Sequence, residues 1–166
     1  EDLLALSRIE QDAEQDAMET EETSLREMLL SALSLCQHQA SQRRVRLELT
    51  GEEDVTLHVN SRLLEQAVVN LIENAIKYSE ARQTVHVVLR VDAEADEIVI
   101  AVEDHGPGIA SEHLPRLFER FYRVDKARSR EAGGSGLGLS IVKHIAQAHG
   151  GYPSVKSTLT QGSVFA

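Results

Sequence analysis

The spacing of apolar residues changes repeatedly along this chain, from every three or four residues to every two residues and back. Spacing of three or four predicts amphipathic helices, and alternation predicts strands with one buried face. We expect helices over 25–40, 61–79 and 136–149, and strands over 45–49, 55–59, 84–91, 96–103, 152–157 and 162–166. This pattern indicates a mixed α/β domain.

Two pairs of the expected strands are separated by short turns, so 45–59 and 84–103 each predict a hairpin. A sheet with hairpins cannot be all parallel, and we expect a mixed, antiparallel-rich sheet of about five strands. Such a sheet can keep one face in water, so about three helices should cover the other face in a two-layer sandwich. The segment 104–135 is too long for a simple connector and predicts a functional loop, such as a lid.

Composition narrows the class of protein further. The chain has 166 residues, 42% hydrophobic and 27% charged, which is typical of a folded domain. No apolar run approaches 18 residues and no basic-then-apolar leader is present, so we expect neither a membrane span nor a secretion signal. The single cysteine, Cys36, excludes an internal disulfide and favours a reducing compartment. Because Cys36 lies on the apolar stripe of the first helix, we expect it in the core.

Charge is distributed unevenly. Of the net charge of −10, most lies in residues 1–22, which contain nine acidic residues and one basic residue, Arg8. An acidic chain is a poor partner for nucleic acid. Residues 113–130 are locally basic, which suits a small polyanion better than a polymer.

Asn70, Asn74 and Lys77 fall on one stripe of the second expected helix, because residues four and seven apart stack on a helix. Carboxamide oxygens are hard ligands that suit Mg²⁺, and a lysine supplies a mobile positive charge for phosphate. The alternative is an ordinary solvated helix face, although asparagine is unfavourable inside helices.

Two glycine-rich motifs follow. Asp104, Gly106 and Gly108 come directly after a strand, where glycines permit close approach of a ligand and the carboxylate can accept from an exocyclic amine such as that of adenine. A plain turn is the alternative. The run 133–138 opens an amphipathic helix whose N-terminus can attract phosphate, but its spacing is neither that of a P-loop nor that of a dinucleotide fingerprint.

Taken together and in this order, the motifs resemble those of the catalytic and ATP-binding domain of bacterial sensor histidine kinases, in the superfamily that also includes gyrase, the Hsp90 chaperones and the MutL proteins. The corresponding segments are the N box (70–78), the first glycine box (104–109), the F box (117–123), the second glycine box (134–139) and a last, weaker box (162–165). The resemblance covers roughly 25–166, and residues 1–18 resemble the end of a dimerisation helix. It therefore implies a dimerisation-helix end and acidic linker over 1–22 and an ATP-binding domain over 23–166.

The resemblance implies a Bergerat-type sandwich with a long ATP lid, and a role for each matching residue. Asn70 and Asn74 would hold Mg²⁺, while Lys77, Tyr78 and Arg123 would contact phosphate or the lid. The residues implied at the adenine end are Asp104, Gly106, Gly108, Ile109 and Ser163. Those implied at the lid hinge and helix start are Gly134, Gly136, Leu137, Gly138 and Leu139. Phe118 and Phe121 are expected to anchor the lid, and the catalytic set would be Arg123, Lys77 and Asn70.

The implied reaction is transfer of the ATP γ-phosphate to a histidine on a dimerisation domain outside this chain. In gyrase-like ATPases a glutamate that activates water stands where this chain has Asn70, which cannot take a proton near neutral pH. Glu73, on the neighbouring part of the helix, leaves hydrolysis open as an alternative, and a nucleotide-binding regulatory module is another. None of the seven histidines lies in the phosphoacceptor motif, so we expect no self-phosphorylation.

The implied partners are the dimerisation domain of the same kinase and a response regulator. The resemblance also implies that the chain is a cytoplasmic fragment of a homodimeric kinase anchored in the bacterial inner membrane.

Overall fold

The computed structural model describes residues 18–52, 55–124 and 135–166. In chain order its elements are β1 (Glu21–Ser24), α2 (Leu25–Arg43), β2 (Arg46–Gly51), β3 (Thr56–Val59), α3 (Ser61–Tyr78), β4 (Thr84–Asp92), β5 (Glu97–Asp104), η1 (Leu114–Arg116), α5 (Gly138–Ala148), β6 (Val155–Thr158) and β7 (Gly162–Phe165). None of the helices in these ranges is long and apolar enough to cross a membrane.

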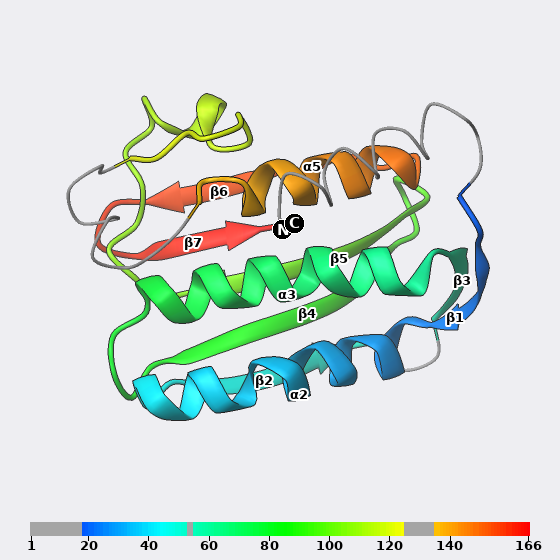
Figure 1. The fold of residues 1–166 in the computed structure, drawn as a ribbon, viewed down its shortest axis with the longest axis horizontal. Helices are drawn as coiled ribbons and strands as arrows, with labels where there is room; N and C mark the ends of the chain where they lie inside the picture. Colours follow the sequence, from blue (N-terminus) through cyan, green and yellow to red (C-terminus); the bar gives the residue numbers. More distant parts are fainter. Residues whose placement is uncertain (1–17, 53–54, 125–134) are drawn as a thin grey trace.

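Five strands form one sheet in the order β2-β4-β5-β7-β6. β2 is parallel to β4, and the remaining neighbours are antiparallel. Helices α2, α3 and α5 lie side by side on one face of this sheet, with α3 in the middle (Figure 1). The predicted two-layer sandwich, with its mixed and antiparallel-rich sheet, is confirmed, and so is the hairpin formed by β4 and β5.

The hairpin expected over 45–59 is wrong. β2 pairs in parallel with β4, with Leu47 opposite Val85, whereas β3 pairs with β1 in a separate two-stranded sheet. After β2 the N–H of Glu52 still donates to the Leu89 carbonyl at 2.9 Å, so the chain follows β4 and does not fold back on itself. Alternation indicates which face of a strand is buried, but it does not identify the neighbouring strand.

Strand β1 is a second feature that sequence reasoning missed. Its sequence, EETS, has no apolar alternation, and only Thr23 is buried. The strand is held by antiparallel pairing, with Thr23 opposite Leu57, and the Asn60 side chain donates to the Glu19 carbonyl at 2.9 Å. Backbone pairing thus fixes the segment before α2 to the start of α3, across the boundary expected between residues 22 and 23.

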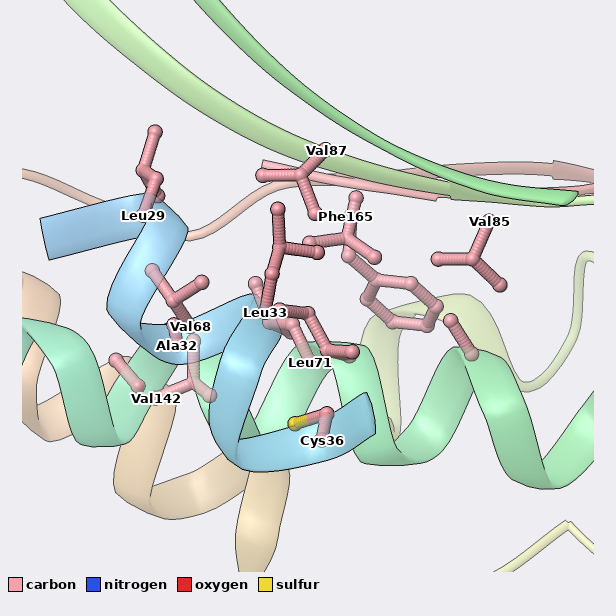
Figure 2. Packing of buried hydrophobic residues seen from close by; sticks show 14 of the residues in the cluster. Leu29, Ala32, Leu33, Cys36, Val68, Leu71, Val85, Val87, Val142 and Phe165 are labelled. Atoms are coloured by element: carbon pink, nitrogen blue, oxygen red, sulfur yellow. The ribbon is translucent and has the colours of Figure 1, made fainter. Parts of the chain in front are cut away.

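Helix α2 forms where the apolar spacing predicts it. Ser24 caps its start, since Ser24 Oγ accepts from the N–H of Glu27 at 3.4 Å. The buried residues include the whole expected stripe: Leu25, Leu29, Ala32, Leu33, Cys36 and Ala40. Figure 2 shows this face packed towards the sheet and α3. Burial raises the pKa of the Cys36 thiol to about 11, with a further contribution from the charge of Glu73.

Helices α3 and α5 complete the layer. Asn60 caps the start of α3, and its side chain accepts from the N–H of Leu63 at 2.9 Å. α5 begins at Gly138, slightly later than the expected Gly136. α3 contacts a helix on each side, and its buried stripe faces the sheet. Its carboxyl end lies at the end of the sandwich, beside the 104–124 segment (Figure 1).

Candidate functional site

The carboxyl half of α3 forms one wall of a cavity of about 340 Å³. All three residues of the expected stripe line this cavity. The lining includes eight of the residues implied by the family resemblance: Asn70, Asn74, Lys77, Tyr78, Arg123, Gly136, Gly138 and Leu139. Three separate segments of the chain therefore meet at one place.

Another hollow, of about 440 Å³, lies beside β1. Its charged lining is Glu21, Glu22, Glu27, Glu65 and Arg62. An excess of carboxylates repels a polyanion, so the cavity beside α3 is the candidate site.

Two cations face the α3 cavity. Burial lowers the pKa of Lys77, and the neighbouring charges of Arg123 and Arg43 lower it further. Nη2 of Arg123 is buried and makes no hydrogen bond to the part of the chain that the structure describes. Cations held this close together gain stability when an anion enters between them. The geometry therefore fits a phosphate group.

The carboxamides of α3 suit a hard cation. Asn70 Nδ2 donates to the Gly138 carbonyl at 3.4 Å, which leaves the carboxamide oxygen as the atom for a ligand. Asn74 lines the cavity one helical turn further on. The described residues contain no cluster of three or more His, Cys, Asp or Glu suited to a metal. An ion such as Mg²⁺, which commonly keeps waters and takes phosphate oxygens, fits this donor set.

Asp104 and Ser163 belong to a second cluster, beside the cavity and not in its lining. They face each other on β5 and β7, and both are buried. The N–H of Gly106 donates to Asp104 Oδ1 at 2.8 Å. Burial raises the pKa of Asp104, while the backbone N–H groups of Gly106 and Ser163 partly oppose this by stabilising the carboxylate. The cluster thus presents a constrained acceptor.

Gly106 connects the second cluster to α3. A Cβ atom at this position would lie 2.6 Å from the carbonyl oxygen of Tyr78 and 2.9 Å from Asp104 Oδ1, so only glycine fits. Tyr78 itself lines the cavity. The two groups of predicted residues therefore both lie next to Tyr78, the last residue of α3. The carboxyl end of α3 and the end of β5 lie at the same end of the sandwich (Figure 1).

The turn after Asp104 packs on the β6–β7 hairpin. Gly108 has φ 69°, and a Cβ there would lie 2.1 Å from the Thr158 carbonyl oxygen. The N–H of Ile109 donates to Ser157 Oγ at 2.8 Å. Close backbone approach, more than side-chain contact, sets the position of this turn.

The segment between β5 and α5 contacts the core through Leu117, which is buried, and Phe118, whose ring is 6.4 Å from that of Phe165. Phe121 is 58% exposed, and its N–H donates to the Gly136 carbonyl at 3.0 Å. Of the two aromatic residues expected to anchor the lid, Phe118 reaches the core and Phe121 faces solvent. Leu137 is buried in the core and does not line the cavity, and Gly134 lies outside the described residues.

Sequence reasoning missed several residues that line the cavity. Gln66 lies one helical turn before Asn70, and Glu73 lies three residues after it, so helical spacing could have found both. Tyr122 lies in the segment 117–123 and next to Arg123, so the motif could have indicated it, whereas Gln39 comes from α2 and no local pattern relates it to α3. Only the three-dimensional fold brings Gln39 to the site.

Comparison with known proteins agrees with this geometry. Residues 59–166 match the family described as histidine kinase-, DNA gyrase B- and HSP90-like ATPase. The sensor histidine kinase YkoH of Bacillus subtilis (strain 168) is 43% identical over 122 residues, which are 74% of this chain and 26% of that kinase. The chain thus spans about a quarter of the length of that relative.

Two solved structures share the fold. The mycobacterial sensor histidine kinase MprB superposes with a TM-score of 0.75 at 28% identity, covering 88% of this chain and 93% of the other. Full-length ShkA, solved in complex with AMPPNP, gives 0.79 at 26% identity, covering 99% of this chain and 33% of ShkA. Family match, fold and the charged cavity agree, and the chain belongs to the histidine kinase-, DNA gyrase B- and HSP90-like ATPases as a catalytic domain of the sensor histidine kinase type.

Proposed function

We propose that this chain binds ATP and Mg²⁺ beside α3 and transfers the γ-phosphate to a histidine on a dimerisation domain. The observation that carries the proposal is the convergence of Asn70, Asn74, Lys77 and Arg123 on one cavity. The complex of the structural relative ShkA with AMPPNP supports a nucleotide as the ligand.

The proposed chemistry needs little covalent help from the protein. Phosphoryl transfer depends on positioning and on neutralising charge at the transferring group. Lys77 and Arg123 supply positive charge, and Asn70 and Asn74 would hold Mg²⁺, which when bound neutralises phosphate oxygens. Asp104 would accept from the adenine amine and fix the base at the far end.

Hydrolysis is a second candidate because Glu73 lines the same cavity. A carboxylate can act as a general base towards water, which the carboxamide of Asn70 cannot do. An acceptor histidine brings its own nucleophile, so transfer fits the site without a base. We therefore rank transfer first.

The proposed partners extend beyond this chain. The acceptor would be the dimerisation domain of the same kinase, and residues 1–22 would form the end of its helix and an acidic linker to the domain at 23–166. Residues 1–17 of this segment lie outside the described residues. Glu21 and Glu22, at its end, pair with β3 and so belong to the fold of the domain. The complete kinase would be a homodimer anchored in the bacterial inner membrane with this domain in the cytoplasm, and it would pass phosphate to a response regulator.

The test mixes the chain with ATP labelled at the γ-phosphate, Mg²⁺ and a separately produced dimerisation domain. Acid-labile label on that domain, lost when the metal is chelated, is the expected result. Steady ADP release without the acceptor would favour hydrolysis. Nucleotide binding with neither product would favour a regulatory module.

A further inference from the structure

Ser157, on β6, makes three hydrogen bonds at the proposed adenine end. Its Oγ accepts from the N–H of Ile109 at 2.8 Å and donates to the Gly162 carbonyl at 2.9 Å. The same atom lies 2.9 Å from Ser163 Oγ. Neither motif spacing nor apolar pattern points to this serine.

Counting protons fixes the direction of the bond between the two serines. A hydroxyl has one proton and two acceptor lone pairs. The Gly162 carbonyl can only accept, so it takes the proton of Ser157, and the Ile109 N–H occupies one lone pair. Ser157 then has only an acceptor position left for Ser163, and Ser163 must donate its own proton to Ser157.

The remaining lone pairs of Ser163 are therefore directed elsewhere. Ser163 and Asp104 are directly opposed on neighbouring strands, so their side chains lie on one face. Asp104 is held by two backbone N–H donors and, when ionised, can only accept. Both side chains offer acceptors, and a group that only accepts, such as a ring carbonyl, finds no donor between them.

We propose that Ser157 is a specificity-determining positioning residue: by taking the Ser163 proton, it makes this end of the site select a purine with an amine at C6 over one with a carbonyl there. The inference rests on the proposed function, because it assumes that a purine nucleotide binds at Asp104. Without Ser157, the Ser163 hydroxyl can rotate and donate to a C6 carbonyl.

The test compares ATP with inosine triphosphate, whose base has a carbonyl at C6, by calorimetric affinity on the purified chain. The wild type should prefer ATP. Ser157→Ala should reduce the ratio of the two affinities by about three- to tenfold, the range expected for one hydrogen bond. Ser157→Thr, which retains the hydroxyl, should restore the ratio, and Ser154→Ala, which removes an exposed hydroxyl just before the same strand, should leave it unchanged.

The affinity ratio separates this role from a purely structural one, because general loosening of the hairpin would weaken both nucleotides equally. An unchanged affinity ratio in Ser157→Ala would overturn the inference. A wild type that binds both nucleotides equally well would also overturn it. In either case, nucleotide binding itself would still support the proposed function. Absence of binding to either nucleotide would refute the proposed function itself. If the alanine variant does not fold, Ser157→Cys, a weak donor and acceptor of similar size, should move the ratio in the same direction.

Discussion

The proposed nucleotide site has a phosphate half and a purine half, and the two differ in construction. The phosphate half, Asn70, Asn74 and Lys77, is a row of side chains on one helix. The purine half, Asp104, the turn at 106–109, Ser157 and Ser163, comes from three strands and a turn held by backbone contacts. Substitution in the first half should therefore remove function and leave the fold intact, whereas substitution in the second should affect both.

The largest expected effect is that of Asn74→Ala in the phosphate half. Loss of this proposed metal ligand should reduce phosphoryl transfer by several hundredfold, since a bound metal stabilises the transition state by several kcal/mol. The free energy of unfolding, measured with urea, should change by less than about 0.5 kcal/mol, as for other changes outside the core. Normal transfer by this variant would remove Asn74 from the site.

Arg123→Ala should reduce the transfer rate by about 100-fold and ATP affinity by much less, because a cation aimed at developing charge acts mainly in the transition state. Single-turnover rates and equilibrium affinities measure the two effects separately. Arg123→Lys, which keeps the charge without the guanidinium geometry, should recover part of the rate. Equal losses of rate and affinity would assign Arg123 to ground-state binding.

Gly106→Ala tests the purine half. The new Cβ would lie 2.6 Å from the Tyr78 carbonyl oxygen, so we expect a loss of about 1–3 kcal/mol in the free energy of unfolding. Gly138→Ala is the matched control, because its Cβ would meet only Asn70 Cγ, at 3.9 Å. Thermal melting of both variants gives the comparison. Equal stability would show that the two halves tolerate backbone change alike.

Asp104→Asn should weaken ATP binding about tenfold at neutral pH, the effect expected for a hydrogen bond to a charged group. Because burial raises the pKa of Asp104, ATP affinity of the wild type should fall as pH falls through that raised pKa, above the ordinary 3.8. Stability has the opposite sign: the folded chain favours the protonated carboxyl, so the contribution of Asp104 is present at low pH and is lost as pH rises through the folded pKa. In Asp104→Asn, neither the ATP affinity nor the stability should depend on pH in this range. A loss of ATP affinity at acid pH that persists in the variant would come from another titratable group.

Lys77→Arg should have the smallest effect, a few-fold loss of ATP affinity at neutral pH from altered geometry. Burial, Arg123 and Arg43 lower the pKa of Lys77 below 10.5, so wild-type affinity should decrease as pH rises through that lowered pKa. In the folded chain the neutral amine is favoured, so stability changes in the opposite direction and increases with pH there. The arginine of the Lys77→Arg variant stays charged, so this variant should not lose ATP affinity at alkaline pH. ATP affinities of both proteins measured between about pH 7 and pH 10 test this, and a decrease that persists in the variant would be caused by another group.

The phosphate half was predictable from sequence because a helix fixes the relation between residues close in the chain. Asn70, Asn74 and Lys77 needed only the helical repeat. In the purine half, the position of Asp104 after a strand indicated it from sequence. Ser163 required the family resemblance, since it is related to Asp104 by strand register, which the sequence does not specify. Ser157 gave no signal at all, because its importance arises from two neighbours on other segments.

Errors in the predicted fold have the same origin. The alternation in β2 correctly identified its buried face, yet β4 and not β3 is its neighbour. β1 has no alternation to detect, because hydrogen bonds to β3 stabilise it and only Thr23 is buried. Local patterns predicted elements formed by side-chain burial and failed for those defined by long-range pairing.

The buried thiol of Cys36 has a practical consequence. With a pKa of about 11 and 2% exposure, it should react with iodoacetamide at neutral pH only after the domain opens. The alkylation rate of this one cysteine then reports how often the chain unfolds. A nucleotide that binds only the folded chain will slow alkylation by the factor 1 + [L]/Kd, so the protein provides an affinity assay that needs no acceptor domain and no labelled phosphate.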